Sequence, residues 1–553
     1  MLSLLPPTLR AQKSAAAALL PLKYDAKPTS AAISAGDLMS RLYVFADDSM
    51  QGREAGTMGH MMGTAYIANE LKKLGLKPAG DAGSFFQSVP FLSRTFSNNS
   101  MLTVGHRALF GFTDFIALPF RGAAPRAVDG AEAIYGGVWG ATSSALTEAQ
   151  VAGKLVVFVA PNGIGRLPSN SPLQRAAGVA IIGGEMLTSA HVSLGHTASL
   201  TLKTPVLGPT TPVVLIVTRP TAELMLGAPM TTMAVGATGT RLTGNLIYEE
   251  TAAPTRNVVA ILPGSDPILK GQYVALGAHS DHIGMRGSGV DHDSLHLYSA
   301  ERFFVTANLS GTPLTSEQRI DRDARLAAIR VNLDSVRAAR PARRDSINNG
   351  ADDDGSGTVT LLEVAEAFAK GRTKPRRSLL FVWHTGEEKG LLGSRYFTDN
   401  PTVSRDSIVA QINMDMVGRG AASDFPGGSD RSLLLIGSRR LSTELGDLTE
   451  VVNKEQKTPF ALDYTYDANG HPENGYCRSD HYNYARYGIP VVFFTTGLHG
   501  DYHQVTDEPQ YIDYPHMARI GQLVFDLANR LAGLNHRPVV DKPKLDPNGT
   551  CTQ

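Results

Sequence analysis

The second half of the chain alternates short apolar runs with amphipathic helical segments, and no other sequence feature constrains the fold as strongly. One such segment, residues 359–369, places Leu361, Leu362, Ala365 and Phe368 on a single apolar stripe. This alternation predicts an α/β fold with a mostly parallel central sheet and helices on both faces. We expect its strands at residues 273–278, 378–383, 408–412, 433–436 and 489–494.

The length of the chain indicates more than one domain. A single hydrophobic core stops growing at about 250–300 residues, and this chain has 553. Residues 114–251 carry short β-like runs, such as 154–159 and 176–184, between Gly, Thr and Pro residues. We expect an N-terminal segment 1–29, the first part of a main domain 30–113, a mainly-β insert 114–251, the rest of the main domain 252–540 with a charged excursion 290–346, and a tail 541–553.

The charge balance restricts the partners. The chain has 52 Lys plus Arg and 52 Asp plus Glu, so it lacks the electrostatic attraction that holds a polyanion, and we expect no nucleic-acid partner. No run approaches the roughly 18 apolar residues of a membrane-spanning helix, so no membrane span is expected. The sequence does not determine the oligomeric state.

The beginning of the chain bears on its location. Residues 1–12 are largely apolar and include Pro6 and Pro7, but they lack the basic start of a complete export signal. We interpret residues 1–29 as the remnant of such a signal, which predicts a secreted or periplasmic protein.

Five motifs rich in acidic residues and histidine follow the expected strands or lie in the loops between them. Open α/β sheets bind ligands at the carboxyl ends of their strands, so these motifs predict one shared site. They are Ala278-His279-Ser280-Asp281-His282, Gly350-Ala351-Asp352-Asp353-Asp354, Gly386-Glu387-Glu388, Asn413-Met414-Asp415-Met416 and Asp501-Tyr502-His503.

The residue types in these motifs favour a hydrolytic metal centre. Imidazoles and carboxylates without a thiolate suit zinc or a similar divalent ion at a catalytic site. Three consecutive aspartates, 352–354, would repel one another in a dry cleft unless a cation neutralised them. Glu387 and Glu388 can divide the work, because one can bind metal while the other takes a proton from water.

Together the motifs HSDH, GADDDGSG, GEEKGLLGS, NMDMVG, SDH and DYH resemble the dizinc aminopeptidases related to bacterial leucyl aminopeptidase and glutamate carboxypeptidase. The resemblance covers residues 31–92 and 257–531 in the family's order and implies a zinc exopeptidase fold. Residues 114–251 resemble the protease-associated domain that many relatives carry, through GKLVV at 153–157 and AAGVA at 176–180.

The resemblance implies that five residues bind two Zn²⁺ ions per chain. One ion would be held by His279 and Asp415, the other by Glu388 and His503, and Asp353 would bridge both. The sequence departs from the family after His503, where the family's His-x-Pro-x-Asp-Thr is replaced by His503-Gln504-Val505-Thr506-Asp507-Glu508.

Three further roles follow from the same resemblance. Glu387 would be the general base, and the carboxylate of Asp281 would orient the imidazole of His279. Tyr476 would stabilise the oxyanion of the tetrahedral intermediate. In the family the peptide bond matching Asp353–Asp354 is cis.

Other residues near the motifs receive structural roles. We expect packing or supporting hydrogen bonds, rather than metal binding, for His282, His292, His384, His481 and His499, and structural roles for Asp352 and Asp480. Cys477 lies near a cysteine that some secreted relatives pair locally, but it has no close partner in sequence, so we expect no disulfide to Cys551.

The expected function is therefore that of a metallo-exopeptidase, an aminopeptidase that hydrolyses peptides or small proteins. Carboxypeptidase action of the glutamate carboxypeptidase type is the main alternative. A glutaminyl cyclase with one zinc and a metal-free, receptor-like binding protein are two further possibilities. The excursion 290–346 is interpreted as a solvated helical segment, with a lid over the site as the alternative.

Overall fold

The computed structural model describes residues 20–25, 27–28, 31–118, 125–139, 146–160, 171–203, 210–307, 314–372, 374–549 and 551–553. The chain forms two compact units. Unit 1 comprises the chain up to Val89, Thr255–Pro547 and Cys551–Gln553, and unit 2 comprises Pro90–Pro254 and Asn548–Thr550. Most of segment 1–29, interpreted above as an export-signal remnant, lies outside the described residues.

Unit 1 is built on a mixed sheet whose strands occur in the order β19-β18-β20-β17-β13-β16-β12. The four strands from β20 to β16 are parallel to one another, whereas β18 and β12 join them antiparallel. All five expected strands are present. The bounds are β12 (Tyr248–Leu262), β13 (Tyr273–His279), β16 (Ser378–His384), β17 (Ile408–Met414), β18 (Ser432–Ile436), β19 (Ala461–Asp463) and β20 (Val491–Thr495), with β1 (Lys77–Pro78) paired to β12.

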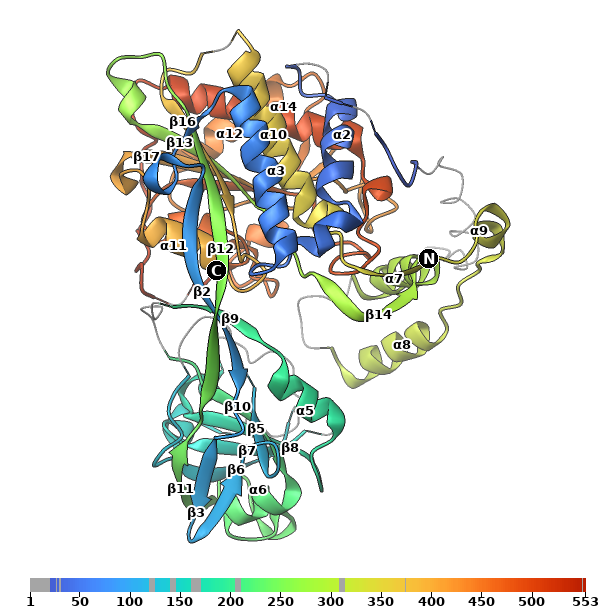
Figure 1. Cartoon of the computed structure of the whole chain (residues 1–553), viewed down its shortest axis with the longest axis vertical. Coiled ribbons are helices and arrows are strands. Elements are labelled where there is room, and N and C mark those ends of the chain that lie inside the picture. The colour runs from blue at the N-terminus through green and yellow to red at the C-terminus, as the bar shows by residue number, and fades with distance from the viewer. Residues whose placement is uncertain are drawn as a thin grey trace. The chain divides into compact units, whose positions relative to one another are not determined.

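Helices cover both faces of this sheet, as expected. Along β13, Leu276 and Ala278 join one buried cluster and Ala275 joins the other, because successive side chains of a strand point to opposite faces. Figure 1 shows α2, α3, α10 and α14 gathered together. The helices of this first face are α2 (Ala35–Phe45), α3 (Met58–Leu74), α10 (Gly357–Lys370), α12 (Thr443–Glu455) and α14 (Tyr514–Gly533). Those of the second are α11 (Leu392–Asp399) and α13 (His481–Ala485).

Local sequence explains these central elements. The apolar stripe of α10 is completely buried, as its spacing indicates. All seven residues of β16 are buried, which is typical of a parallel strand covered on both faces. Helix α14 begins where the side chain of Asp513 accepts a hydrogen bond from the His516 N–H over 3.0 Å.

Unit 2 contains an eight-stranded sheet with the order β4-β3-β11-β6-β7-β8-β10-β5. The runs 154–159 and 176–184 form the buried strands β7 and β8. Residues 101–110 pair into this sheet through β3 and β11, so unit 2 begins earlier than the expected position 114. The bounds are β2 (Phe86–Phe96), β3 (Met101–Val104), β4 (Arg107–Phe110), β5 (Phe115–Ala117), β6 (Glu132–Val138), α4 (Glu148–Val151), β7 (Leu155–Val159), β8 (Gly178–Gly184), α5 (Ser189–His196), β9 (Ser199–Leu202), β10 (Val213–Thr218), α6 (Arg219–Leu226) and β11 (Thr238–Asn245).

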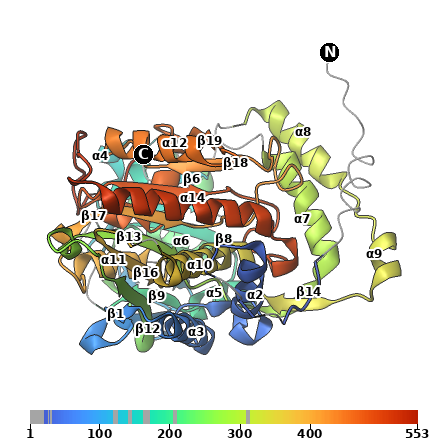
Figure 2. The same ribbon diagram turned by 90° about the horizontal axis from the view of Figure 1, so that it is seen from above.

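The charged excursion of unit 1 is largely helical, as expected. It leaves and re-enters through the two-stranded sheet of β14 (Met285–Asp291) and β15 (Arg344–Ile347), and its helices are α7 (His292–Thr306), α8 (Ser316–Ala327) and α9 (Asp334–Ala339). Both views place α7, α8 and α9 together at one edge of unit 1 (Figures 1 and 2). Arg337 of α9 donates hydrogen bonds to Asp291 at the end of β14 and to Asp293 in α7, and so connects α9 to the start of the excursion.

The expectation that the cysteines stay unpaired is wrong, because Cys477 and Cys551 form a disulfide with their Cα atoms 5.8 Å apart. The two cysteines are 74 positions apart, so no local sign in the sequence indicated that they lie close together. The C-terminal tail returns to the loop around Cys477, where the side chain of Gln553 accepts a hydrogen bond from the Tyr476 N–H over 2.8 Å. Among the described helices, none is long and apolar enough to cross a membrane.

Candidate metal centre

The motif residues gather at the carboxyl ends of the central strands of unit 1. His279 is the last residue of β13, Asp415 directly follows β17, and Glu388 lies just beyond β16. Asp353 precedes α10, and His503 lies in the loop after β20. The strand order therefore brings together side chains that are up to 224 positions apart in the sequence.

Three of these side chains form a first group. The Nε2 atom of His279 lies 3.1 Å from Oδ1 of Asp353 and 3.5 Å from Oδ1 of Asp415. All three residues are buried, and their ligand atoms lie within 4.8 Å of one another.

A second group surrounds the other oxygen of Asp353. The Nε2 atom of His503 lies 3.1 Å from Oδ2 of Asp353 and 3.0 Å from Oε2 of Glu388. The other oxygen of the Glu388 carboxylate, Oε1, lies 2.8 Å from Nδ1 of His282. Asp353 thus presents one carboxylate oxygen to each group, which is the arrangement of a bridging ligand.

The directions of the histidine nitrogens fit metal binding. Among the residues that the structure describes, Nε2 of His279 and Nε2 of His503 have no hydrogen-bond partner, although each lies near two carboxylates. Buried polar atoms normally have a partner. Nitrogen and oxygen atoms that converge without bonding to one another suit divalent ions placed between them, and this donor set matches zinc.

Electrostatics lead to the same conclusion. Burial lowers the pKa of His503, but the adjacent carboxylates of Asp353 and Glu388 outweigh burial and raise it to about 10. Burial, opposed by His279 and reinforced by Asp415, raises the pKa of Glu387 well above its ordinary value. The cluster therefore carries excess negative charge that requires protons or cations.

Neighbouring groups hold the ligands in place. The hydroxyl of Ser479 donates to Oδ2 of Asp415 over 2.7 Å, which leaves Oδ1 facing His279. The side chain of Asp507 accepts a hydrogen bond from the Asp353 N–H over 3.0 Å, so the altered sequence after His503 still supports the bridging carboxylate. The peptide bond between Asp353 and Asp354 is cis.

Asp281 occupies a different position from the one expected. Nδ1 of His279 donates to the main-chain oxygen of Asp281 over 2.9 Å, while the Asp281 carboxylate lies 3.9 Å from that nitrogen. The carboxylate accepts a hydrogen bond from the main-chain N–H of Glu387 instead. Asp281 therefore orients His279 through its backbone and Glu387 through its side chain.

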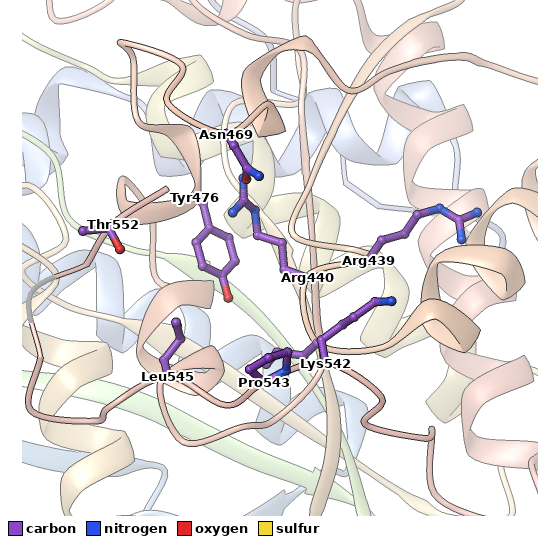
Figure 3. A pocket seen from close by; sticks show the side chains of 9 residues that line it. Arg439, Arg440, Asn469, Tyr476, Lys542, Pro543, Leu545 and Thr552 are labelled. Atoms are coloured by element: carbon purple, nitrogen blue, oxygen red, sulfur yellow. The ribbon is translucent and has the colours of Figure 1, made fainter.

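Tyr476 does not lie where an oxyanion ligand is needed. It is 2% exposed, belongs to the apolar cluster on the second face of the sheet, and packs its ring 4.6 Å from the guanidinium of Arg440. Figure 3 shows it lining a separate pocket with Arg440, Pro543 and Leu545. The expected role of Tyr476 is therefore not supported, because its place in the sequence near the Ser-Asp-His motif did not fix the direction of its side chain.

Another tyrosine faces the metal centre. Tyr502 lines one pocket together with Asp353, Glu387 and Asp415. It directly precedes His503 in the Asp-Tyr-His motif, a signal that sequence reasoning could have used. Arg478 and Ser479 line the same pocket and were also missed, although both lie within three residues of Tyr476.

Most of the additional histidines have other partners. His384 lies 3.3 Å from Asp480, His499 lies 3.2 Å from Asp352, and the ring of His481 stacks on Phe493. His292 lies near Asp345 and Glu508, where Arg343 donates to Glu508 over 2.8 Å. His292, Asp345 and Glu508 also form a group that could hold a metal ion, and His282 belongs to the second ligand group around Asp353, so neither histidine has the simple packing role expected from the sequence.

The fold and this site define a mixed α/β domain in which Asp353 lies between two groups of side chains that could each hold a metal ion. Residues 331–528 match the model of Peptidase family M28. The segment contains Asp353, Glu387, Glu388, Asp415 and His503. The resemblance to dizinc aminopeptidases inferred from the motifs is thereby confirmed at the level of the family.

Curated relatives agree with this assignment. Leucine aminopeptidase 1 of Paracoccidioides brasiliensis (strain Pb03) is 31% identical over 210 residues, covering 34% of this chain and 51% of the relative. Leucine aminopeptidase 1 of Blastomyces gilchristii (strain SLH14081) is 33% identical over 216 residues, with coverages of 34% and 51%. The chain thus spans about half the length of the curated relatives it matches.

Solved structures also resemble the chain. The aminopeptidase from Aneurinibacillus sp. strain AM-1 is 16% identical, with 93% of this chain and 97% of that chain covered and a TM-score of 0.48. The zinc aminopeptidase BSAP from Bacillus subtilis is 16% identical, with coverages of 93% and 99% and a TM-score of 0.45.

Proposed function

We propose that the chain is a zinc-dependent aminopeptidase that removes N-terminal residues from peptides or small proteins with two metal ions. One observation carries this proposal: Glu387, which belongs to neither ligand group, lines the same pocket as Asp353 and Asp415. A carboxylate beside a bridged metal pair can take the proton of an attacking water.

The proposed ligands are those inferred from the motifs: His279 and Asp415 for one ion, Glu388 and His503 for the other, and Asp353 for both. When bound, the zinc ions would supply Lewis-acid polarisation of water and of the scissile carbonyl. Glu387 accepts the proton of the nucleophile and returns it to the leaving amine. Burial raises the pKa of the Glu387 carboxyl, which is the direction that favours proton acceptance.

The pocket beside Glu387 suits an apolar side chain of the substrate. Met416, Ile436, Phe493 and Leu498 form its apolar wall. Tyr502 from the same lining is placed to donate a hydrogen bond to the developing oxyanion. The names of the curated relatives, leucine aminopeptidases, also favour an apolar N-terminal residue.

Carboxypeptidase action is the second candidate, because a cationic side chain lines the same pocket. Arg478 is 40% exposed and lies 3.5 Å from Glu473. A guanidinium at this position could bind the C-terminal carboxylate of a substrate. The family segment and the aminopeptidase relatives favour the first candidate.

A glutaminyl cyclase and a receptor-like protein have less support. A cyclase with one zinc leaves one of the two ligand groups unexplained, and a receptor-like protein leaves both unexplained. We also propose that unit 2 is a protease-associated domain, which the location of β7 and β8 within an insert supports. Secretion or periplasmic location is supported by the disulfide, since disulfides persist in oxidising compartments.

A panel of aminoacyl arylamides, assayed with zinc and with a chelator, tests the proposal. We expect chelator-sensitive hydrolysis of apolar aminoacyl substrates, and metal analysis should find two ions per chain. Dipeptides blocked at the amino end or at the carboxyl end separate the two exopeptidase candidates. Hydrolysis of only the amino-blocked dipeptide would establish the carboxypeptidase, and one ion per chain would reopen the cyclase.

A further inference from the structure

We propose that His282 is a fourth protein ligand of the metal position formed by Asp353, Glu388 and His503. This inference rests on the proposed two-metal function. It makes the two positions unequal, since the protein supplies four ligands to one and three to the other.

The ring of His282 is held in one orientation. His282 is completely buried, and its main-chain N–H donates to the oxygen of Arg53 over 3.2 Å. The ring packs against Gly350, where an added Cβ atom would lie 2.5 Å from Cγ of His282. Gly350 also has a φ of +53°, a region that glycine tolerates better than other residues. Because glycine has no Cβ atom, Gly350 leaves space for the imidazole of His282 beside the ligand group.

The nitrogens of His282 are directed as metal ligands rather than as hydrogen-bond donors. Nδ1 lies 2.8 Å from Oε1 of Glu388 and 3.7 Å from Oδ2 of Asp353. Among the described residues, neither ring nitrogen points at an acceptor with the angle that a hydrogen bond requires. A hydrogen bond requires the N–H to point at its acceptor. Atoms this close that do not point at each other converge on a shared position, as Nε2 of His503 also does.

The separations match one tetrahedral ion. Zinc bonds of about 2.0–2.1 Å place neighbouring ligand atoms of a tetrahedron roughly 3.3 Å apart. Nδ1 of His282 lies 2.8 Å from Oε1 of Glu388, and Nε2 of His503 lies 3.0 Å from the other oxygen, Oε2, of the same carboxylate. The distances to Oδ2 of Asp353 are 3.1 Å from Nε2 of His503 and 3.7 Å from Nδ1 of His282. They scatter around the required value, and all the ligand atoms lie within 4.8 Å of one another.

The position at His279 is different, because the described part of the chain offers it His279, Asp353 and Asp415 and no fourth ligand. Zinc sites with four protein ligands are typically closed and structural, whereas catalytic sites keep an open coordination position. The His282 position is therefore the tighter one and fills first. The His279 position exchanges its metal and leaves room for a small ligand.

Zinc binding to the metal-free full chain tests this assignment without any assay of hydrolysis. X-ray absorption of the chain loaded with one equivalent of zinc should show two imidazoles, those of His282 and His503. A spectrum with one imidazole would overturn the proposal, whichever position the ion occupied. This measurement uses the unaltered chain, so it does not depend on the folding of a variant.

Chelator-competition titrations of His282→Asn provide the second test. We expect the affinity of the tighter equivalent to fall by at least about tenfold, with little change at the weaker one. His481→Asn is the matched control, because His481 is equally buried but stacks on Phe493. Unchanged affinities in His282→Asn would count against His282 as a ligand. A chain that passes both metal tests but hydrolyses no peptide would refute the proposed function and leave this inference standing.

Discussion

The main-chain N–H of Glu387 donates a hydrogen bond to Oδ1 of Asp281 over 3.2 Å. The same Asp281 accepts the Nδ1–H of His279 at its main-chain oxygen. One residue thus links the proposed general base to a proposed metal ligand through two separate groups. The short segment that follows β13 therefore helps to fix the position of Glu387 relative to His279, and the consequences for activity can be tested.

Replacement of Glu387 by Gln should abolish most activity and leave the metal content unchanged. The amide cannot take the proton of the nucleophile, so kcat for an aminoacyl arylamide should fall by about 10²–10⁴-fold. Zinc analysis of the same preparation checks that the ligands are intact. Glu455→Gln, on the exposed surface of α12, is the control. Near-normal turnover in Glu387→Gln would remove this residue from the role.

The two tyrosines should respond differently to loss of the hydroxyl. Tyr502→Phe should lower kcat by about 10²-fold, because Tyr502 lines the pocket with Asp353 and Glu387. Tyr476→Phe should change kcat by less than about twofold, since its ring lies in a separate pocket. Steady-state kinetics of both variants decide the question. A large loss in Tyr476→Phe alone would restore the assignment made from the sequence.

Ser479→Ala should weaken metal binding without removing a ligand. Its hydroxyl donates to Oδ2 of Asp415 over 2.7 Å, and partners of this kind typically contribute about 10–100-fold to metal affinity. Titration with zinc against a competing chelator measures the effect. Ser404→Ala is the control at an exposed serine. Equal affinities in the two variants would show that the carboxylate needs no such support.

The excursion 290–346 should open locally more often at low pH. Burial alone would raise the pKa of Asp293, but hydrogen bonds from Arg340 and Arg337 outweigh it and hold the pKa below its ordinary value. A carboxylate with a depressed pKa stabilises the fold above its unfolded pKa, and this contribution is lost as the pH falls through the folded value. Hydrogen exchange in α7 and α9, corrected for the intrinsic rate, should therefore accelerate below about pH 4.

Asp293→Asn should produce the same loosening at neutral pH. Loss of its charge-assisted hydrogen bonds should lower the local free energy of opening by about 1–3 kcal/mol. Asp334→Asn, at an exposed aspartate of α9, should have little effect. If exchange in the excursion is the same in both variants at pH 7, Asp293 does not anchor it.

Loss of the disulfide should destabilise unit 1. The bridge closes a loop of 74 residues, and removing such a constraint costs about 2–4 kcal/mol. Cys551→Ser should therefore lower the Tm, and reductant should lower the Tm of the unaltered chain by the same amount. The double variant with Cys477→Ser should be insensitive to reductant. KM should also rise in Cys551→Ser, because Arg478 and Ser479 directly follow Cys477 and line the pocket.

The sequence by itself determined the elements and the chemistry of the centre. The apolar stripe of α10 and the apolar runs that became β13 and β16 are set by local periodicity, which is visible in any chain. Open parallel sheets bind ligands at the carboxyl ends of their strands, so the acidic motifs that follow the strands were expected to form one site. The family resemblance supplied the pairing of ligands.

Only the tertiary structure decided where individual side chains point. It placed Tyr476 in an apolar cluster and Tyr502 at the centre, returned the C-terminal tail to Cys477, and packed His282 against Gly350. Spacing along a chain fixes which residues share a strand or a helix face. The direction of a loop side chain depends on contacts with segments hundreds of residues away, and those contacts exist only once the chain has folded.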